Sequence, residues 1–201
     1  DITSPTRIDR SDTNASSMLV KSWDIQANYN FDLDAIGLGS WGDFRAGLNA
    51  TYTDTYTWQE GPDKPVREAK GHQNNSFGAV PIIPEWRANL SLGWSLGNHS
   101  ISTTVRYIDE VIFDANEFSF QAYLRPQNLW TTTDVIRAWT QTDMFYTYNN
   151  LEVYGGNATL SLGARNLFDR EAQKTGMIAG VVSQIQSPLG RMLYARIGYE
   201  F

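Results

Sequence analysis

The chain has 201 residues, and its 16 Lys and Arg against 22 Asp and Glu give a net charge of −6, without the basic excess of a nucleic-acid-binding protein. The absence of cysteine excludes a disulfide scaffold, a thiolate metal site and a cysteine nucleophile. No apolar stretch approaches the ~18 residues of a membrane helix, yet 13% of the residues are aromatic. This composition leaves open a membrane protein that crosses the bilayer with strands.

Alternation of apolar and polar residues predicts seven strands, because successive side chains of a strand point to opposite faces. In chain order they cover residues 18–33, 44–53, 86–96, 100–107, 140–148, 158–165 and 193–201. From residue 23 onward, one face of these strands carries no charge, and the other has only Phe145 and Tyr194 as large apolar or aromatic residues. The fold class expected is all-β.

The strand lengths and the aromatic residues indicate a transmembrane antiparallel β-barrel. Strands of about nine residues or more suit a tilted bilayer crossing, whereas the strands of soluble proteins have a mode of ~5–6 residues. Aromatic residues at the two strand ends predict two interfacial belts. One belt has Trp23, Trp58, Trp86 and Tyr107, and the other has Phe31, Phe44, Trp94, Tyr148 and Phe201.

The connections predict how the barrel is oriented. Short connections at about 34–42, 97–98 and 149–157 alternate with long ones at about 59–83, 109–138 and 168–187. Outer-membrane barrels have short periplasmic turns and long extracellular loops, so residues 1–17 are expected to be extracellular and the last residue periplasmic. Seven strands do not make a complete bacterial barrel, since those have even counts. We therefore expect residues 1–201 to be the C-terminal part of a larger barrel.

Motifs in the last third resemble the end of a TonB-dependent outer-membrane receptor. They are Asn166-Leu167-Phe168-Asp169, Pro188-Leu189-Gly190-Arg191 and the terminal Tyr199-Glu200-Phe201. The resemblance extends upstream to about residue 18, although residues 130–142 match no pattern of the family. It implies a barrel of about 22 strands in a Gram-negative outer membrane, of which this chain would be the last third. The plug domain, the other strands and the plug's contact with the energy-coupling TonB protein would lie outside the chain.

The same resemblance implies a C-terminal signal that the barrel-assembly machinery reads. Such a signal ends in Phe with apolar or aromatic residues at every second position. Leu193, Ile197, Tyr199 and Phe201 fit this pattern, and the small Ala195 interrupts it. The alternative, that they form an ordinary lipid-facing strand, is compatible with the signal.

Aromatic residues of the predicted extracellular loops are candidate ligand contacts, because rigid rings stack on sugars and cover apolar groups. The candidates are Phe77, Phe118, Phe120, Tyr123 and Trp130. The alternative is that these rings, with Phe113, only pack the loops on one another.

The polar face is expected to line the barrel lumen and meet the plug. Its arginines are Arg45, Arg87, Arg106, Arg165 and Arg196, beside the acidic residues Asp24, Asp32, Asp143 and Glu200. Buried charges need partners, so plug contact and solvation by trapped water are the two alternatives.

Other site chemistry is weakly supported. The acidic cluster of Asp109, Glu110, Asp114 and Glu117 lacks the spacing of a calcium loop, and Gly37-x-Gly39-x-x-Gly42 precedes a strand, not the helix that a dinucleotide site requires. We expect no catalytic residue, metal or cofactor. The function expected is energised uptake of a siderophore, oligosaccharide or peptide. The alternatives are a self-standing small barrel with a structural or adhesive role and an outer-membrane enzyme using His72 or His99.

Overall fold

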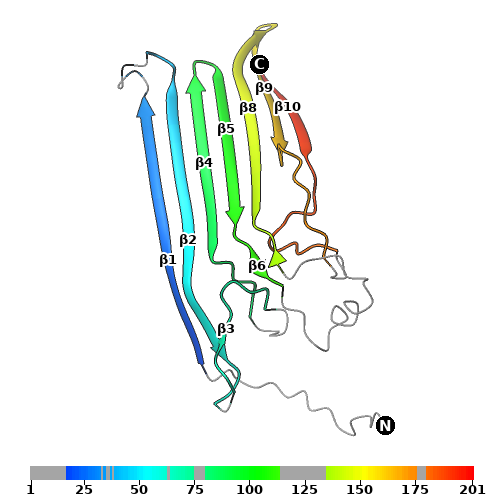
Figure 1. Ribbon diagram of the computed structural model, residues 1–201. Helices are drawn as coiled ribbons and strands as arrows, with labels where there is room; N and C mark the ends of the chain where they lie inside the picture. Colours follow the sequence, from blue (N-terminus) through cyan, green and yellow to red (C-terminus); the bar gives the residue numbers. More distant parts are fainter. Residues whose placement is uncertain are drawn as a thin grey trace.

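The computed structural model describes residues 17–32, 34, 37, 39–62, 64–74, 80–113, 135–175 and 180–201, which contain no α-helix (Figure 1). The strands are β1 (Ser17–Asp32), β2 (Asp43–Gln59), β3 (Arg67–Glu68), β4 (Trp86–Leu96), β5 (His99–Ile108), β6 (Val111–Ile112), β7 (Val135–Ile136), β8 (Trp139–Val153), β9 (Gly156–Arg165) and β10 (Met192–Glu200). In these described parts, no helix long and apolar enough to cross a membrane occurs.

Seven long strands form one antiparallel sheet in which each strand pairs with its neighbours in the chain. The order is β1-β2-β4-β5-β8-β9-β10, with the short β3 pairing beside β2, and β6 and β7 form a separate small sheet. The seven predicted strands are therefore confirmed. Their lengths, from 9 residues in β10 to 17 in β2, allow each of them to cross a bilayer.

The described parts of the short turns lie at one end of the sheet, and the described parts of the long connections lie at the other (Figure 1). The long connections are residues 60–85, 109–138 and 166–191. An antiparallel meander brings alternate connections to opposite ends of the sheet. The predicted alternation of short and long connections is therefore confirmed.

The turn between β8 and β9 is tighter than the sequence predicted. Its central residues are Tyr154 and Gly155, with φ angles of 48° and 85°, as in the type I′ turn that suits a hairpin. The loop expected over 149–157 is shorter because β8 continues through a β-bulge to Val153. A bulge interrupts the period of two, and the sequence pattern then ends too early.

The register keeps side chains of one kind on one face across all seven long strands. One cross-strand row consists of Phe31, Phe44, Trp94, Ile101, Tyr146, Leu162 and Ala195. The next row, on the opposite face, consists of Asp32, Asp43, Ser95, Ser100, Thr147, Ser161 and Arg196. We call these the apolar face and the polar face. The pairing agrees with the face assignment made for each strand from alternation alone.

One predicted belt residue lies on the other face. Asp54 of β2 has no partner in β1, so the alternation of β2 shifts by one residue beyond it. Trp58 consequently pairs with Met18 on the polar side, whereas Trp23 and Trp86 lie on the apolar face. The expectation that Trp58 belongs to the aromatic belt is wrong, because strict alternation does not reveal a bulge.

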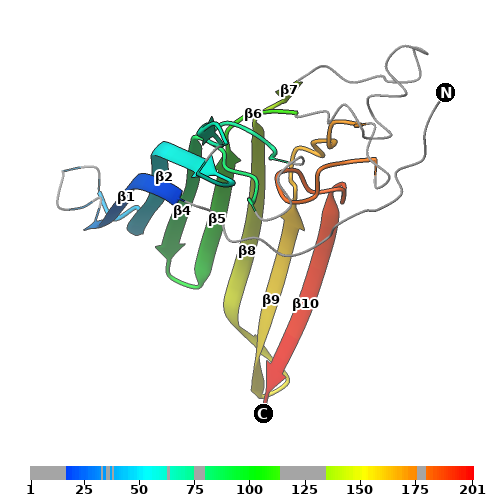
Figure 2. The same cartoon turned by 90° about the horizontal axis from the view of Figure 1, so that it is seen from below.

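The largest group of buried apolar residues lies among the long connections. Its members, each at most 3% exposed, are Val111, Phe113, Ile136, Trp139, Val182 and Ile185. Figure 2 shows the described parts of the long connections gathered together beside the curved sheet. By contrast, Leu193 and Ile197 on the apolar face are each 76% exposed. The chain therefore leaves a broad apolar surface for a non-aqueous environment to cover.

Candidate functional surfaces

Among the described residues, two of the five predicted lumen arginines have hydrogen-bonded or ion-pair partners. Arg106 of β5 forms an ion pair with Asp143 of β8, and Arg87 Nη2 donates to the carbonyl oxygen of Ile82 at 3.3 Å. Both arginines lie on the polar face toward the long connections. The ion pair of Arg106 therefore joins strands β5 and β8. The hydrogen bond of Arg87 joins β4 to the long connection before it.

The other three arginines lie elsewhere on the polar face. The guanidinium carbon of Arg165 lies 5.7 Å from the centroid of the Tyr194 ring, which is cation–π distance. Arg45 and Arg196 have no hydrogen-bonded or ion-pair partner among the described residues. These two guanidinium groups can therefore donate hydrogen bonds to water or to an incoming acidic group.

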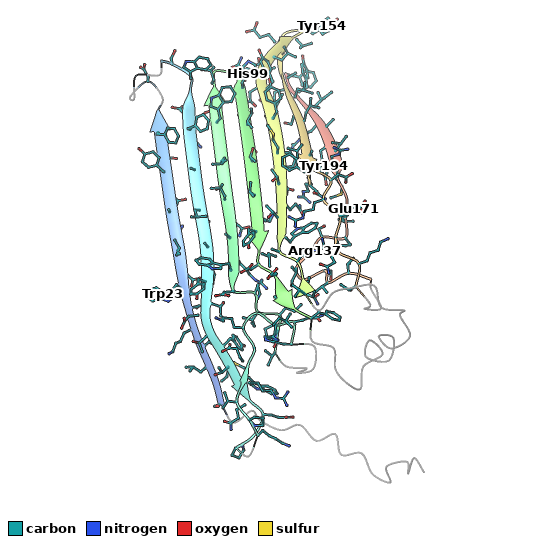
Figure 3. All side chains as sticks on the ribbon, viewed as in Figure 1. Trp23, His99, Arg137, Tyr154, Glu171 and Tyr194 are labelled. Carbon is teal, nitrogen blue, oxygen red and sulfur yellow. The ribbon has the colours of Figure 1, made fainter. Side chains whose placement is uncertain are left out.

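Phe145 and Tyr194 form an aromatic patch on this otherwise polar face, with Tyr194 visible on β10 in Figure 3. Their ring centroids are 6.2 Å apart. Gly163 of β9 lies between them in the register, and a Cβ at this position would overlap the Phe145 ring. With Arg165 and Arg196, the two rings line a pocket of about 390 Å³. Both rings stand out in the sequence as exceptions on the polar face, but their contact across Gly163 is visible only in the structure.

Asp143 is the most fully bonded carboxylate that the structure describes on the polar face. Its side chain is buried, and its Oδ1 accepts hydrogen bonds from Gln141 Nε2 and from the backbone N–H of Asn166, both at 2.9 Å. Its Oδ2 accepts from Arg106. Sequence analysis placed Asp143 among the lumen charges, but nothing in the pattern indicated its bond to the connection after β9.

Two of the motifs that carried the family resemblance contact each other. Asn166 Nδ2 donates to the carbonyl oxygen of Leu189 at 3.3 Å. The backbone N–H of Arg191 donates to Asp169 Oδ1 at 2.7 Å, and a Cβ at Gly190 would lie 3.1 Å from the same oxygen. The motifs therefore close the base of the connection between β9 and β10.

The predicted ligand contacts of the long connections are not tested by the structure. Phe77, Phe118, Phe120, Tyr123 and Trp130 all lie outside the described residues. Phe113, at the start of the second long connection, is 3% exposed within the buried cluster. For that ring, packing of the connections is the role that the structure supports.

Aromatic pairs mark both ends of the apolar face. Tyr52 and Trp86 have ring centroids 4.7 Å apart toward the long connections, and Phe31 and Phe44 stack at 5.4 Å toward the short turns. Trp23 pairs with Tyr52 and lies eight residues from Phe31 on β1, or about 26 Å along the strand. That span is on the scale of the ~25 Å apolar band of outer-membrane barrels.

His99 belongs to the belt at the short-turn end (Figure 3). Its Nδ1 lies 2.7 Å from the hydroxyl oxygen of Tyr146, and its ring meets Tyr148 edge-on at 4.9 Å. In the described part of the chain, no carboxylate or serine is bonded to this imidazole. The arrangement differs from a nucleophile, base and orienting acid.

The predicted assembly-signal residues lie at the free edge of the sheet. Leu193, Ile197 and Tyr199 are on the apolar face of β10, and Phe201 follows the strand. The hydroxyl of Tyr199 donates to the carbonyl oxygen of Val153 at 2.9 Å, and its ring meets Phe201 at 4.9 Å. Recognition by assembly machinery stays a prediction.

The acidic cluster was the candidate for a calcium site. Asp109 Oδ1 accepts from the hydroxyl of Tyr107 at 2.9 Å, and Asp114 and Glu117 lie outside the described residues. Over the ranges that the structure describes, no three His, Asp or Glu side chains gather as a metal ion would require.

The comparisons with known proteins agree with the sheet and its motifs. The model of the family described as TonB dependent receptor-like, beta-barrel, matches residues 2–167, from before β1 to just beyond β9. No curated protein and no solved structure matches the chain. Proteins of this family are outer-membrane receptors for nutrient uptake in Gram-negative bacteria, not enzymes. Because the match covers most of its length, the chain belongs to the TonB-dependent receptor β-barrel family.

Proposed function

We propose that this chain is the C-terminal third of a 22-stranded receptor barrel that imports a scarce nutrient, such as a siderophore, an oligosaccharide or a peptide. The observation that carries the proposal is the family match together with the open sheet. Its seven long strands follow one another in chain order, and β1 and β10 each leave one edge unpaired. In lipid the unpaired backbone groups of such edges cost several kcal/mol each. The rest of the barrel would supply the missing neighbours of β1 and β10.

The two faces have different surroundings in this proposal. The apolar face contacts outer-membrane lipid, with its aromatic rows at the two interfaces. The long connections and residues 1–17 are extracellular, and the short turns are periplasmic. The exposure of Leu193 and Ile197 supports this assignment, because both would be covered by lipid.

The polar face would line the lumen and meet a plug domain that lies outside this chain. Arg45 and Arg196 are the strongest candidates for ion pairs with the plug, since neither has a partner among the described residues. Arg165 would add its guanidinium at the aromatic patch, and Arg87 and Arg106 would contribute through their exposed parts. Energy would reach the receptor through contact between the plug and TonB.

Ligand would bind at the extracellular end. Phe77, Phe118, Phe120, Tyr123 and Trp130 are proposed contacts, because they lie in two of the three long connections and carry rings suited to stacking. On the last strand, Leu193, Ile197, Tyr199 and Phe201 are proposed as the signal that the barrel-assembly machinery recognises. No catalytic residue and no nucleic-acid partner is proposed.

The experiment is to identify the native product in the source bacterium. An antibody against residues 59–83 would be applied to outer-membrane fractions, with and without heating before electrophoresis. We expect a heat-modifiable band several times larger than 22.7 kDa, and loss of energised uptake of one nutrient from a panel when the gene is disrupted. A mature product near 22.7 kDa would contradict the proposal and favour the self-standing small barrel.

A further inference from the structure

Asp143 of β8 links the sheet to the segment between β9 and β10. Its side chain is 6% exposed, and it accepts hydrogen bonds from Arg106, Gln141 and the backbone of Asn166. Three donors, one of them cationic, occupy most of the acceptor sites of an ionised carboxylate. The bond to Asn166 holds the first residue after β9.

Asn166 in turn forms hydrogen bonds at both ends of that connection. We call these ends its two arms, residues 166–175 and 187–191. Its Nδ2 donates to the carbonyl oxygens of Arg170 at 2.9 Å and Leu189 at 3.3 Å. Its Oδ1 accepts from the backbone N–H of Arg170 at 2.9 Å. Its φ of 50° lies in the left-handed region that Asn adopts more readily than most residues. The side chain is 2% exposed, so it acts as an internal clamp.

The same connection is fastened to the start of β8. The guanidinium of Arg170 donates to the carbonyl oxygens of Ala138 at 2.6 Å and Thr140 at 3.3 Å. Its carbon lies 5.1 Å from the centroid of the Trp139 ring. Gln186 Nε2 donates to the carbonyl oxygen of Arg137 at 2.8 Å. Arg170 and Gln186, from the two halves of the connection, are thus both hydrogen-bonded to residues at or just before the start of β8.

We propose that Asp143 is a positioning residue that sets the pose of residues 166–175 and 180–191 at the end of the sheet. Asp143 positions Asn166 through the hydrogen bond to its backbone, and Asn166 positions the two arms through its side chain. Between the arms, Val182 and Ile185 pack in the buried cluster. This rests on the proposed function only in that the connection then forms part of the mouth through which ligand enters. The pose itself is a property of the chain without ligand.

The test is hydrogen–deuterium exchange in the complete receptor in detergent, without ligand. Asp143→Ala should speed exchange of residues 166–175 and 187–191 by about tenfold or more, as expected when a buried hydrogen bond to a charged group is lost. Asp143→Asn should have a smaller effect, because its Oδ1 still accepts from Asn166. Asn166→Gly keeps the left-handed backbone but removes the clamp, so it should also loosen both arms.

Asp24→Ala is the matched control. Asp24 is another carboxylate of the polar face, but it accepts from Thr51 Oγ1 at 2.7 Å and has no bond to the connection. It should leave exchange of both arms unchanged. Unchanged arms in Asp143→Ala would overturn the proposal. Equal acceleration in β4 and β5 would also overturn it, since Asp143 would then support the wall as a whole. Because no ligand is used, neither result depends on whether the receptor imports a nutrient.

Discussion

Leu92 and Ser91 are adjacent on β4, but their side chains lie on opposite faces. Leu92 pairs with Ala46 on the apolar face, and Ser91 Oγ donates to the carbonyl oxygen of Gly47 at 3.2 Å on the polar face. Leu92→Arg should destabilise the receptor by ~2–4 kcal/mol, because the charge enters the middle of the bilayer. Ser91→Arg should cost far less, since water reaches the lumen. Unfolding in lipid measures both, and equal losses would mean that the faces are misassigned.

The Phe145 ring makes position 163 intolerant of any side chain. A Cβ there would overlap the ring, so Gly163→Ala should cost ~1–3 kcal/mol, the usual penalty of overpacking. Gly93→Ala is the control on the same face, because its Cβ would meet only Arg45 Cβ at 3.7 Å. Adding Phe145→Ala to Gly163→Ala should remove the overlap. A double-mutant cycle measures this coupling, and additive losses would refute it.

At the scale of the element, Tyr154 is a poor residue for its turn. Its φ is 48°, a conformation that costs most side chains about 1 kcal/mol and suits Asn. The ring is fully exposed, so Tyr154→Asn should raise the unfolding free energy by about 0.5–1 kcal/mol. Gly155→Ala, at a φ of 85°, should change stability in the opposite direction. Urea unfolding of the receptor would check both, and a loss of stability in Tyr154→Asn would contradict the prediction.

The strands could be predicted from the sequence because alternation is a local property. Each residue reports its face through its immediate neighbours, so no knowledge of a partner strand was needed. The bulge at Asp54 could not be read, because it is defined by the partner strand and moves Trp58 to the other face. The same limit applies to the bond between Asn166 and Leu189, which joins residues 23 positions apart. Patterns predict a face, but they do not predict which side chains meet across it.

For the whole molecule, the two free edges decide how the chain behaves by itself. β1 and β10 each have one long neighbour, β2 and β9 respectively. Residues 1–201 expressed alone in lipid should therefore aggregate or form oligomers that close the edges. Expression together with the remaining strands should give one heat-modifiable species. Analytical size exclusion and heat-dependent electrophoresis distinguish the cases, and a monodisperse, heat-modifiable monomer of the chain alone would refute the prediction.

The order of strands in space is also their order in the chain, and this has a consequence for how such walls change over time. Removing β4 and β5 together would leave β2 followed by β8, which already run in opposite directions and could pair without rerouting the chain. A duplicated hairpin could be inserted just as simply. The number of strands in a barrel built this way can therefore grow or shrink in steps of two, through ordinary duplication and deletion within a gene.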